Sequence, residues 1–307
     1  MRTNTRRVLP AIAAGALVLA ACGGSDDADT ADVADDGPPS SDAVPEADPE
    51  DAAEAPADDS CSNTLEEGVL TVATGEPAFF PYVIDDAPES GEGFEAAVAY
   101  AVAAEMGYEA DAVTWVRAGF DEAIQPGAKD FDFNVQQFSI TPERDEVVDF
   151  SLPYFTSNQA VVALEGSAAE GATSIADLKG VQLGAQVGTT SLTFITDVIQ
   201  PDSEPLVYDD NVGAKAALEA NQIDAAVFDL PTALFVSGVE IEGSSVIGQF
   251  SAEAGGTTDQ FGFVLEDANP LKSCVDAAIT TITDNGELAA ITQEWLADNT
   301  GAPFFSE

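Results

Sequence analysis

The most specific stretch of the chain is SITPERDEVVDFSLPYF, residues 139–155. It contains Arg144, although basic side chains are scarce: 9 Lys and Arg stand against 56 Asp and Glu, for a net charge of −47. The planar guanidinium group of arginine can bind two carboxylate oxygens at once. An arginine inside so specific a motif predicts a site for a carboxylate. A surface ion pair with one of the many acids is the alternative role.

The composition of the chain excludes several classes of function. With 307 residues, of which 45% are hydrophobic, the chain is long enough for about two domains with a sizeable core. Histidine is absent, which excludes Ser-His-Asp and Cys-His nucleophile machinery and every zinc site that contains histidine. The excess of acids makes nucleic acid an implausible partner, because a polyanion requires a basic patch. We expect no metal and no cofactor.

Short apolar strands alternate with helical stretches from residue 61 onward. The predicted strands are 69–74, 131–135, 181–187, 206–208 and 223–228. The predicted helices are 94–106, 189–198, 212–220, 230–237, 271–282 and 288–295. This alternation predicts an α/β fold with mainly parallel sheets, whose ligands bind beyond the carboxyl ends of the strands.

The N-terminal residues have the pattern of a secreted lipoprotein. Three arginines precede an apolar run, 8–21, that is too short to span a bilayer comfortably. The run ends in LAAC, which resembles the bacterial lipobox; an ordinary signal peptide is the alternative. The sequence thus predicts a signal peptide at 1–21, lipid on Cys22, and an acidic disordered tether at 22–60 that holds the protein on the outside of the cell membrane.

Only two cysteines remain once Cys22 carries lipid. They are Cys61 and Cys274, and both would lie in an oxidising compartment. A disulfide between them is the favoured prediction, and two free buried thiols are the alternative. The bridge would fix the first residues of the folded part onto a C-terminal helix.

Other segments accompany the 139–155 stretch in a fixed order. They are GVLTVAT (68–74), GFE (93–95), DLKG (177–180), GTT (188–190), IDAAVFD (223–229), GEL (286–288) and WL (295–296). Together they resemble extracytoplasmic solute-binding protein family 3, the amino-acid-binding proteins that supply ABC importers. The likeness covers residues 65–299.

The resemblance implies a periplasmic-binding-protein type II fold, in which two α/β lobes are joined by a two-strand hinge with the ligand cleft between them. Lobe one is expected at 61–157 and 259–307, and lobe two at 158–258. The implied protein is a monomer and not an enzyme. It captures a free polar or basic L-amino acid by hinge closure and delivers it to an ABC permease. A dehydratase or peptidoglycan-cleaving enzyme on the same fold, or a ligand-sensing input protein, is the alternative.

A free amino acid is a zwitterion, so a cleft that encloses it must supply a partner for each charge. Arg144 suits the carboxylate, and Thr190, at the start of a helix that follows a strand, suits it as a second donor. Asp229, at the end of an apolar strand, is expected to receive the α-ammonium group. For Thr190 and Asp229, a plain helix N-cap is the alternative role.

The family resemblance adds further ligand contacts. It implies Ser139 and the Gln137 backbone as partners of the α-ammonium group, and Thr189 as a neighbour of Thr190. Selection of the ligand side chain is expected from Glu76, Phe79, Gln136, Gln137, Phe138 and Gln186. Glu76 favours a basic ligand unless it merely faces solvent, whereas the glutamines are equally compatible with a neutral polar ligand.

Overall fold

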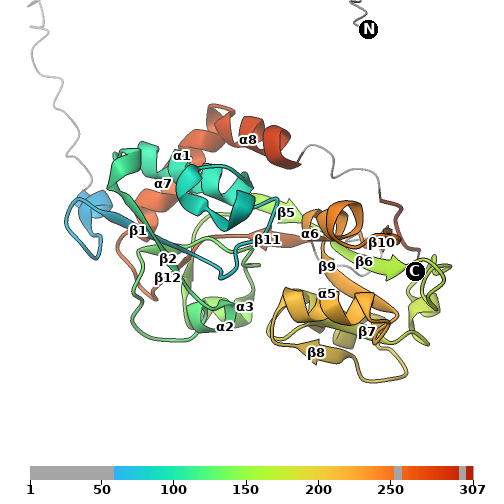
Figure 1. The fold of residues 1–307 in the computed structure, drawn as a ribbon. Helices are drawn as coiled ribbons and strands as arrows, with labels where there is room; N and C mark the ends of the chain where they lie inside the picture. The colour runs from blue at the N-terminus through green and yellow to red at the C-terminus, as the bar shows by residue number, and fades with distance from the viewer. Residues whose placement is uncertain (1–58, 252–257, 297–301, 307) are drawn as a thin grey trace, which may run out of the picture. The chain divides into compact units, whose positions relative to one another are not determined.

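A computed structural model describes residues 59–251, 258–296 and 302–306 (Figure 1). The predicted signal peptide at 1–21, the lipidation site Cys22 and nearly all of the predicted tether at 22–60 lie outside the described residues. Within the described ranges, none of the helices has the length and apolar character needed to cross a membrane.

The first of two five-stranded sheets has the strand order β2-β1-β3-β12-β4. Its strands are β1 (Leu70–Thr74), β2 (Val113–Arg117), β3 (Phe133–Asn134), β4 (Asp149–Phe150) and β12 (Val264–Leu265). β1 runs parallel to β2 and β3, while β12 runs antiparallel to β3 and β4. The helices packed around this sheet are α1 (Phe94–Glu105), α2 (Phe120–Ala123), α3 (Pro142–Asp145), α7 (Lys272–Asp284) and α8 (Glu287–Leu296). Helices α1, α7 and α8 lie together on one side of it (Figure 1). We call this part lobe one.

The second sheet has the order β10-β6-β9-β7-β8. Its strands are β6 (Gln159–Leu164), β7 (Leu183–Gln186), β8 (Leu206–Tyr208), β9 (Ala225–Asp229) and β10 (Ser244–Gln249). Its helices are α4 (Thr190–Phe194), α5 (Asn211–Glu219) and α6 (Leu230–Phe235), and α4 and α6 each continue into a π-helical turn. Alternate residues of β9 belong to two separate apolar clusters, so this sheet is buried on both faces. We call this part lobe two.

Two short strands connect the lobes. β5 (Phe155–Ser157) and β11 (Asp259–Phe261) pair antiparallel and form a sheet of their own. β6 follows β5 directly and runs antiparallel to β9 and β10. The prediction of mainly parallel sheets is therefore wrong, because the strands next to each crossing, β6 and β12, run against their neighbours.

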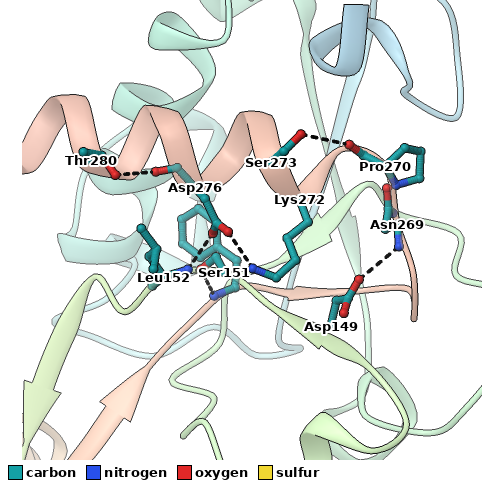
Figure 2. A network of polar contacts seen from close by, with 10 residues as sticks. Asp149, Ser151, Leu152, Asn269, Pro270, Lys272, Ser273, Asp276 and Thr280 are labelled. Carbon is teal, nitrogen blue, oxygen red and sulfur yellow. Dashed lines mark hydrogen bonds and ion pairs between the residues drawn. The ribbon is translucent and has the colours of Figure 1, made fainter. Parts of the chain in front are cut away.

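A polar network fixes the chain where it leaves lobe one (Figure 2). The Asp276 carboxylate on α7 accepts a hydrogen bond from the Leu152 amide at 2.7 Å and forms an ion pair with Lys272. The Ser151 hydroxyl accepts one from the Phe263 amide at 2.8 Å, and Asp149 accepts one from the Asn269 amide at 3.0 Å. These bonds attach the segment before β5 to the segment that follows β11. The lobe-one ends of both hinge strands are therefore held in place.

Cys61 and Cys274 form the predicted disulfide, with Cα atoms 5.2 Å apart. Cys274 is buried on α7, and the Tyr108 hydroxyl donates a hydrogen bond to the Cys61 carbonyl oxygen at 2.7 Å. The bridge attaches the first described turn, Asp59–Ser62, to lobe one.

The last described residues, 302–306, pack on lobe two. Ser306 and Phe304 form β-bridges with Ser174 and Gln249, and the Phe305 ring stacks on Phe250 with the ring centroids 4.8 Å apart. This corrects the expectation that 259–307 belongs wholly to lobe one. The apolar Phe305 side chain is buried there at 4% exposure, which accounts for the position of the segment.

Gly248 offers a test of this packing. A Cβ atom at Gly248 would lie 2.3 Å from Cε2 of Phe305, so we expect Gly248→Ala to displace the ring and lower the free energy of unfolding by about 1–3 kcal/mol. Gly238→Ala is the matched control, since a Cβ atom there meets nothing within 4 Å. Urea denaturation of both variants measures the effect. Equal stability of the two variants would contradict the contact.

Candidate functional site

A cavity of about 330 Å³ lies between the lobes, beyond the carboxyl ends of β1, β7 and β9. The predicted site residues that line it are Glu76, Phe79, Gln136, Gln137, Ser139, Arg144, Gln186, Thr189, Thr190 and Asp229. Sequence positions that are far apart thus converge on one volume. A cavity of this size suits a small solute.

Phe138 is the predicted site residue that does not line the cavity. Its side chain is fully buried and stacks on Phe120, with ring centroids 4.6 Å apart. Phe120, at the start of α2, lines the cavity instead. The aromatic surface expected from Phe138 is therefore presented by its stacking partner.

Arg144 joins the two lobes through hydrogen bonds to backbone carbonyl groups. Its Nη1 donates to the Ser139 carbonyl oxygen at 2.7 Å, and its Nη2 donates to the Gly188 carbonyl oxygen of lobe two at 2.8 Å. In the described part of the chain, its guanidinium group forms no salt bridge. Burial lowers the pKa of Arg144. The nearby carboxylates of Asp259, Asp121 and Glu143 act against this lowering. A partly buried cation that bonds directly only to carbonyl groups among the described residues, with N–H groups to spare, is a site for an anion.

The lobes approach each other closely beside Arg144. Thr189 is the N-cap of α4 and accepts a hydrogen bond from the Leu192 amide, which leaves the Thr190 hydroxyl group 3.2 Å from that of Ser139 across the cleft. Gly188 has φ +71°, and a Cβ atom there would lie 2.4 Å from an Asp121 carboxylate oxygen of lobe one. A glycine at this position permits the approach.

Asp229 has both of the roles that its sequence position allows. It is the N-cap of α6, accepting hydrogen bonds from the Thr232 amide at 3.0 Å and the Thr232 hydroxyl at 2.7 Å, and it also lines the cavity. The Tyr82 hydroxyl of lobe one donates a further hydrogen bond to its Oδ1. Burial raises the pKa of Asp229. The carboxylate therefore contributes both to a contact between the lobes and to the cavity wall.

A buried carboxylate supports Gln137 from behind the cavity. Gln137 has φ +49°, a strained conformation for a residue other than glycine. Glu95 on α1 is fully buried and accepts hydrogen bonds from the Gln137 amide at 2.8 Å, from its side-chain Nε2 and from the Tyr154 hydroxyl. Burial raises the pKa of Glu95 to about 7. Two of the three donors belong to Gln137, so the Glu95 carboxylate holds both its backbone and its side chain in place.

The raised pKa of Glu95 predicts that the protein is more stable in mild acid than at higher pH. Its pKa rises from 4.5 to about 7 on folding, so above pH 4.5 the folded state keeps a proton that the unfolded state loses. Stability then falls as the pH rises, and we expect Glu95 to lower the free energy of unfolding by about 2–3 kcal/mol between pH 5 and pH 8. Burial raises the pKa values of Asp229 and Asp259 too, which adds to the same trend.

Denaturation of wild type and Glu95→Gln at pH 5 and pH 8 tests this expectation. The free energy of unfolding of Glu95→Gln should differ less between pH 5 and pH 8 than that of wild type, because the variant has no proton to lose at position 95. Glu92→Gln, which removes an exposed carboxylate from the turn before α1, should keep the wild-type difference. An unchanged difference in Glu95→Gln would refute the assignment.

The outer part of the cavity is acidic and polar. Glu76 is exposed at the rim, and the Phe79 ring faces the Lys215 ammonium of lobe two at 5.0 Å from its centroid. Gln186 is buried, and the buried Oε1 of Gln136 has no hydrogen-bond partner in the described structure. The carboxylates in the lining are Glu76, Asp121, Glu122, Asp209, Asp210, Asp229 and Asp259. No group of His, Cys, Asp or Glu side chains within the described ranges is arranged to hold a metal ion.

The sequence model of the bacterial extracellular solute-binding proteins, family 3, matches residues 70–298. The chain belongs to this family. The L-cystine-binding protein TcyJ of Escherichia coli K12 is 28% identical over 242 residues, which cover 78% of this chain and 87% of TcyJ. An arginine-binding periplasmic protein of Mannheimia haemolytica is 30% identical over 229 residues, which cover 72% and 89%.

Solved structures confirm the predicted type II fold for this family member. An ancestral arginine-binding protein bound to glutamine superposes with a TM-score of 0.63 at 27% identity, over 76% of this chain and 100% of the other. The arginine-, lysine-, histidine-binding protein ArtJ from Geobacillus stearothermophilus has the same fold, with a TM-score of 0.63 at 23% identity over 75% and 96%.

Several lining or supporting residues of this solute-binding protein escaped the sequence analysis, and four of them matter most for the contacts within the site. These four are Tyr82, Phe120, Gln159 and Asp259. Phe120 could have been found, since it begins a helix just after the carboxyl end of β2. Gln159 and Asp259 lie on or beside the two crossing strands, and no local motif marks them.

Proposed function

We propose that the protein is the extracytoplasmic amino-acid-binding component of an ABC importer, and that it binds a free polar or basic L-amino acid. The observation that carries the proposal is Arg144, which lines the cavity between the lobes and forms no salt bridge with any described residue. The other charged side chains in the cavity lining are carboxylates. The ligand α-carboxylate would bind the Arg144 guanidinium group, with the Thr190 amide as a further donor, because the Thr190 hydroxyl donates its one hydrogen to Asp259. The α-ammonium group would bind Asp229 and Ser139.

Hinge closure would couple ligand binding to the shape of the protein. Arg144 and Ser139 belong to lobe one, whereas Thr190 and Asp229 belong to lobe two, so one ligand that contacts all four stabilises the closed form. Three contacts across the cleft support this view: Tyr82 with Asp229, Ser139 with Thr190, and Arg144 with the Gly188 carbonyl group. In this proposal 61–157 with 259–296 moves as one body and 158–258 as the other.

The polar lining supports a polar or basic ligand side chain. Glu76 and Asp121 of lobe one and Asp209 and Asp210 of lobe two place carboxylates at the cavity from both sides, a field that attracts a cation. Gln136 and Gln186 offer amide groups to a neutral polar side chain. The names of the relatives, which include cystine-, arginine- and histidine-binding proteins, agree with this range.

Attachment and delivery complete the proposal. Lipid on Cys22 would hold the mature protein at the outer face of the cell membrane, with 22–60 as its tether. A monomer of this kind would carry its closed, loaded form to the permease. Labelling with radioactive palmitate in a bacterial host, compared between wild type and Cys22→Ser, tests the anchor.

Titration calorimetry with the twenty amino acids and ornithine tests the function. We expect saturable binding of at least one polar or basic amino acid, with no change in the ligand when it is recovered and examined by mass spectrometry. Failure of every amino acid to bind would overturn the proposal. Formation of a product would instead favour an enzyme on this fold.

A further inference from the structure

A second buried carboxylate lies in the cavity wall near Asp229. Asp259 begins the crossing strand β11, pairs with Ser157 across the hinge, and is 5% exposed while lining the cavity. An ionised carboxylate with so little access to water requires strong partners. In the described part of the chain it forms no salt bridge.

Among the described residues, the hydrogen-bond partners of the Asp259 side chain all bond to the same one of its two carboxylate oxygens. Its Oδ2 accepts hydrogen bonds from Gln159 Nε2 and from the Thr190 hydroxyl, the latter at 3.1 Å. The Gln159 amide has a fixed orientation, because the Ser191 hydroxyl donates to its Oε1 at 2.7 Å and so directs the NH₂ group toward Asp259. The other oxygen, Oδ1, accepts no hydrogen bond from any described residue.

The Asp229 carboxylate has fewer free acceptor sites for hydrogen bonds than the Asp259 carboxylate. Its Oδ1 accepts from the Tyr82 hydroxyl and the Thr232 amide, and its Oδ2 accepts from the Thr232 hydroxyl. A carboxylate has about four lone-pair sites, so three are already used. An ammonium group brings three N–H donors and is poorly satisfied by Asp229 alone.

The arrangement of charges around Asp259 matches the ligand class. Arg144 bonds to the Ser139 carbonyl group, the Ser139 hydroxyl lies 3.2 Å from the Thr190 hydroxyl, and Thr190 bonds to Asp259. A cation and an anion thus face the cavity with two hydroxyl groups between them. A zwitterion whose carboxylate binds Arg144 would turn its ammonium group toward Asp259, since its carboxylate would be repelled there.

We propose that Asp259 is a ligand-binding residue that shares the α-ammonium group of the bound amino acid with Asp229. This inference rests on the proposed amino-acid-binding function and adds a residue of the hinge itself to the site. Occupancy then stabilises a strand that connects the lobes as well as the two lobe surfaces.

The test compares Asp259→Asn with wild type by titration calorimetry, using paired probes. Each of the twenty amino acids and ornithine that binds the wild type is matched with the carboxylic acid that lacks its α-amino group, for example L-glutamine with 5-amino-5-oxopentanoic acid or L-arginine with 5-guanidinopentanoic acid. We expect Asp259→Asn to weaken amino-acid binding about tenfold to a hundredfold, because a charge-assisted hydrogen bond is lost. The affinity of Asp259→Asn for the deaminated acid should equal or exceed that of wild type.

Asp267→Asn is the matched control, because it removes the same charge from an exposed position outside the cavity lining. With a neutral ligand such as L-glutamine it should change affinity by less than about threefold. If Asp259→Asn weakens binding of the amino acid and of the deaminated acid equally, or weakens neither, the inference about Asp259 is overturned while the proposed function stands. Failure of the wild type to bind any amino acid overturns the proposed function and the inference with it.

Discussion

Replacing Arg144 by alanine is expected to weaken amino-acid binding by about 3 kcal/mol or more, roughly 150-fold in Kd. The substitution leaves the ligand carboxylate in a cavity whose other charged side chains are carboxylates. It also removes the hydrogen bond to the Gly188 carbonyl group that joins the lobes. Titration calorimetry with the amino acid that binds wild type most tightly measures the loss.

Lys272→Ala is the control for this variant. Lys272 forms its ion pair with Asp276 on α7 and does not line the cavity, so its removal should leave affinity within about twofold of wild type. Arg117 is less suitable as a control position, because its guanidinium group donates a hydrogen bond to the Gly75 carbonyl oxygen at 2.7 Å. Gly75 directly precedes Glu76, which lines the cavity. Wild-type affinity in Arg144→Ala would exclude the guanidinium group as the carboxylate site.

Removing the disulfide is expected to cause the largest loss of stability. The Cys61–Cys274 bridge joins residues separated by 213 positions, and in the loop-entropy model a closure of this length stabilises the fold by about 5 kcal/mol. The double variant Cys61→Ser/Cys274→Ser should lose most of this stabilisation. Both cysteines lie in lobe one and neither lines the cavity, so affinity should change little.

Denaturation by guanidinium chloride, followed by circular dichroism, measures this loss. Cys22→Ser is the matched control, since it removes a cysteine and leaves the bridge intact. The control should unfold at the wild-type midpoint. A double variant with that same midpoint would show that the bridge does not constrain the unfolded chain.

The regular parts of the fold could be predicted because their patterns are local. Helix α1 shows apolar residues at Phe94, Val98 and Val102 and ends just before Gly107, within one residue of the expected 94–106. β7 and β9 were expected as apolar runs between helices and lie side by side in lobe two. Periodicity and turn residues determine such elements with little help from the rest of the chain.

The remainder of the fold depends on contacts between distant segments. The direction of β6 is determined by the crossing at β5, and the C-terminal segment lies on lobe two because Phe305 is buried against Phe250. In the site, the backbone at Gln137 has a positive φ, and the next side chain, Phe138, lies in the core instead of the cavity. Asp259 reaches the cavity only because β11 pairs with β5.

A crystal structure of the protein with its tightest-binding amino acid tests the central claim most directly. We predict that the ligand lies between the lobes with its α-carboxylate on the Arg144 guanidinium group, and with its α-ammonium group within hydrogen-bond distance of Asp229. The account would be contradicted if Arg144 bonded solely to the Ser139 and Gly188 carbonyl groups while the amino acid bound elsewhere or in the reverse orientation.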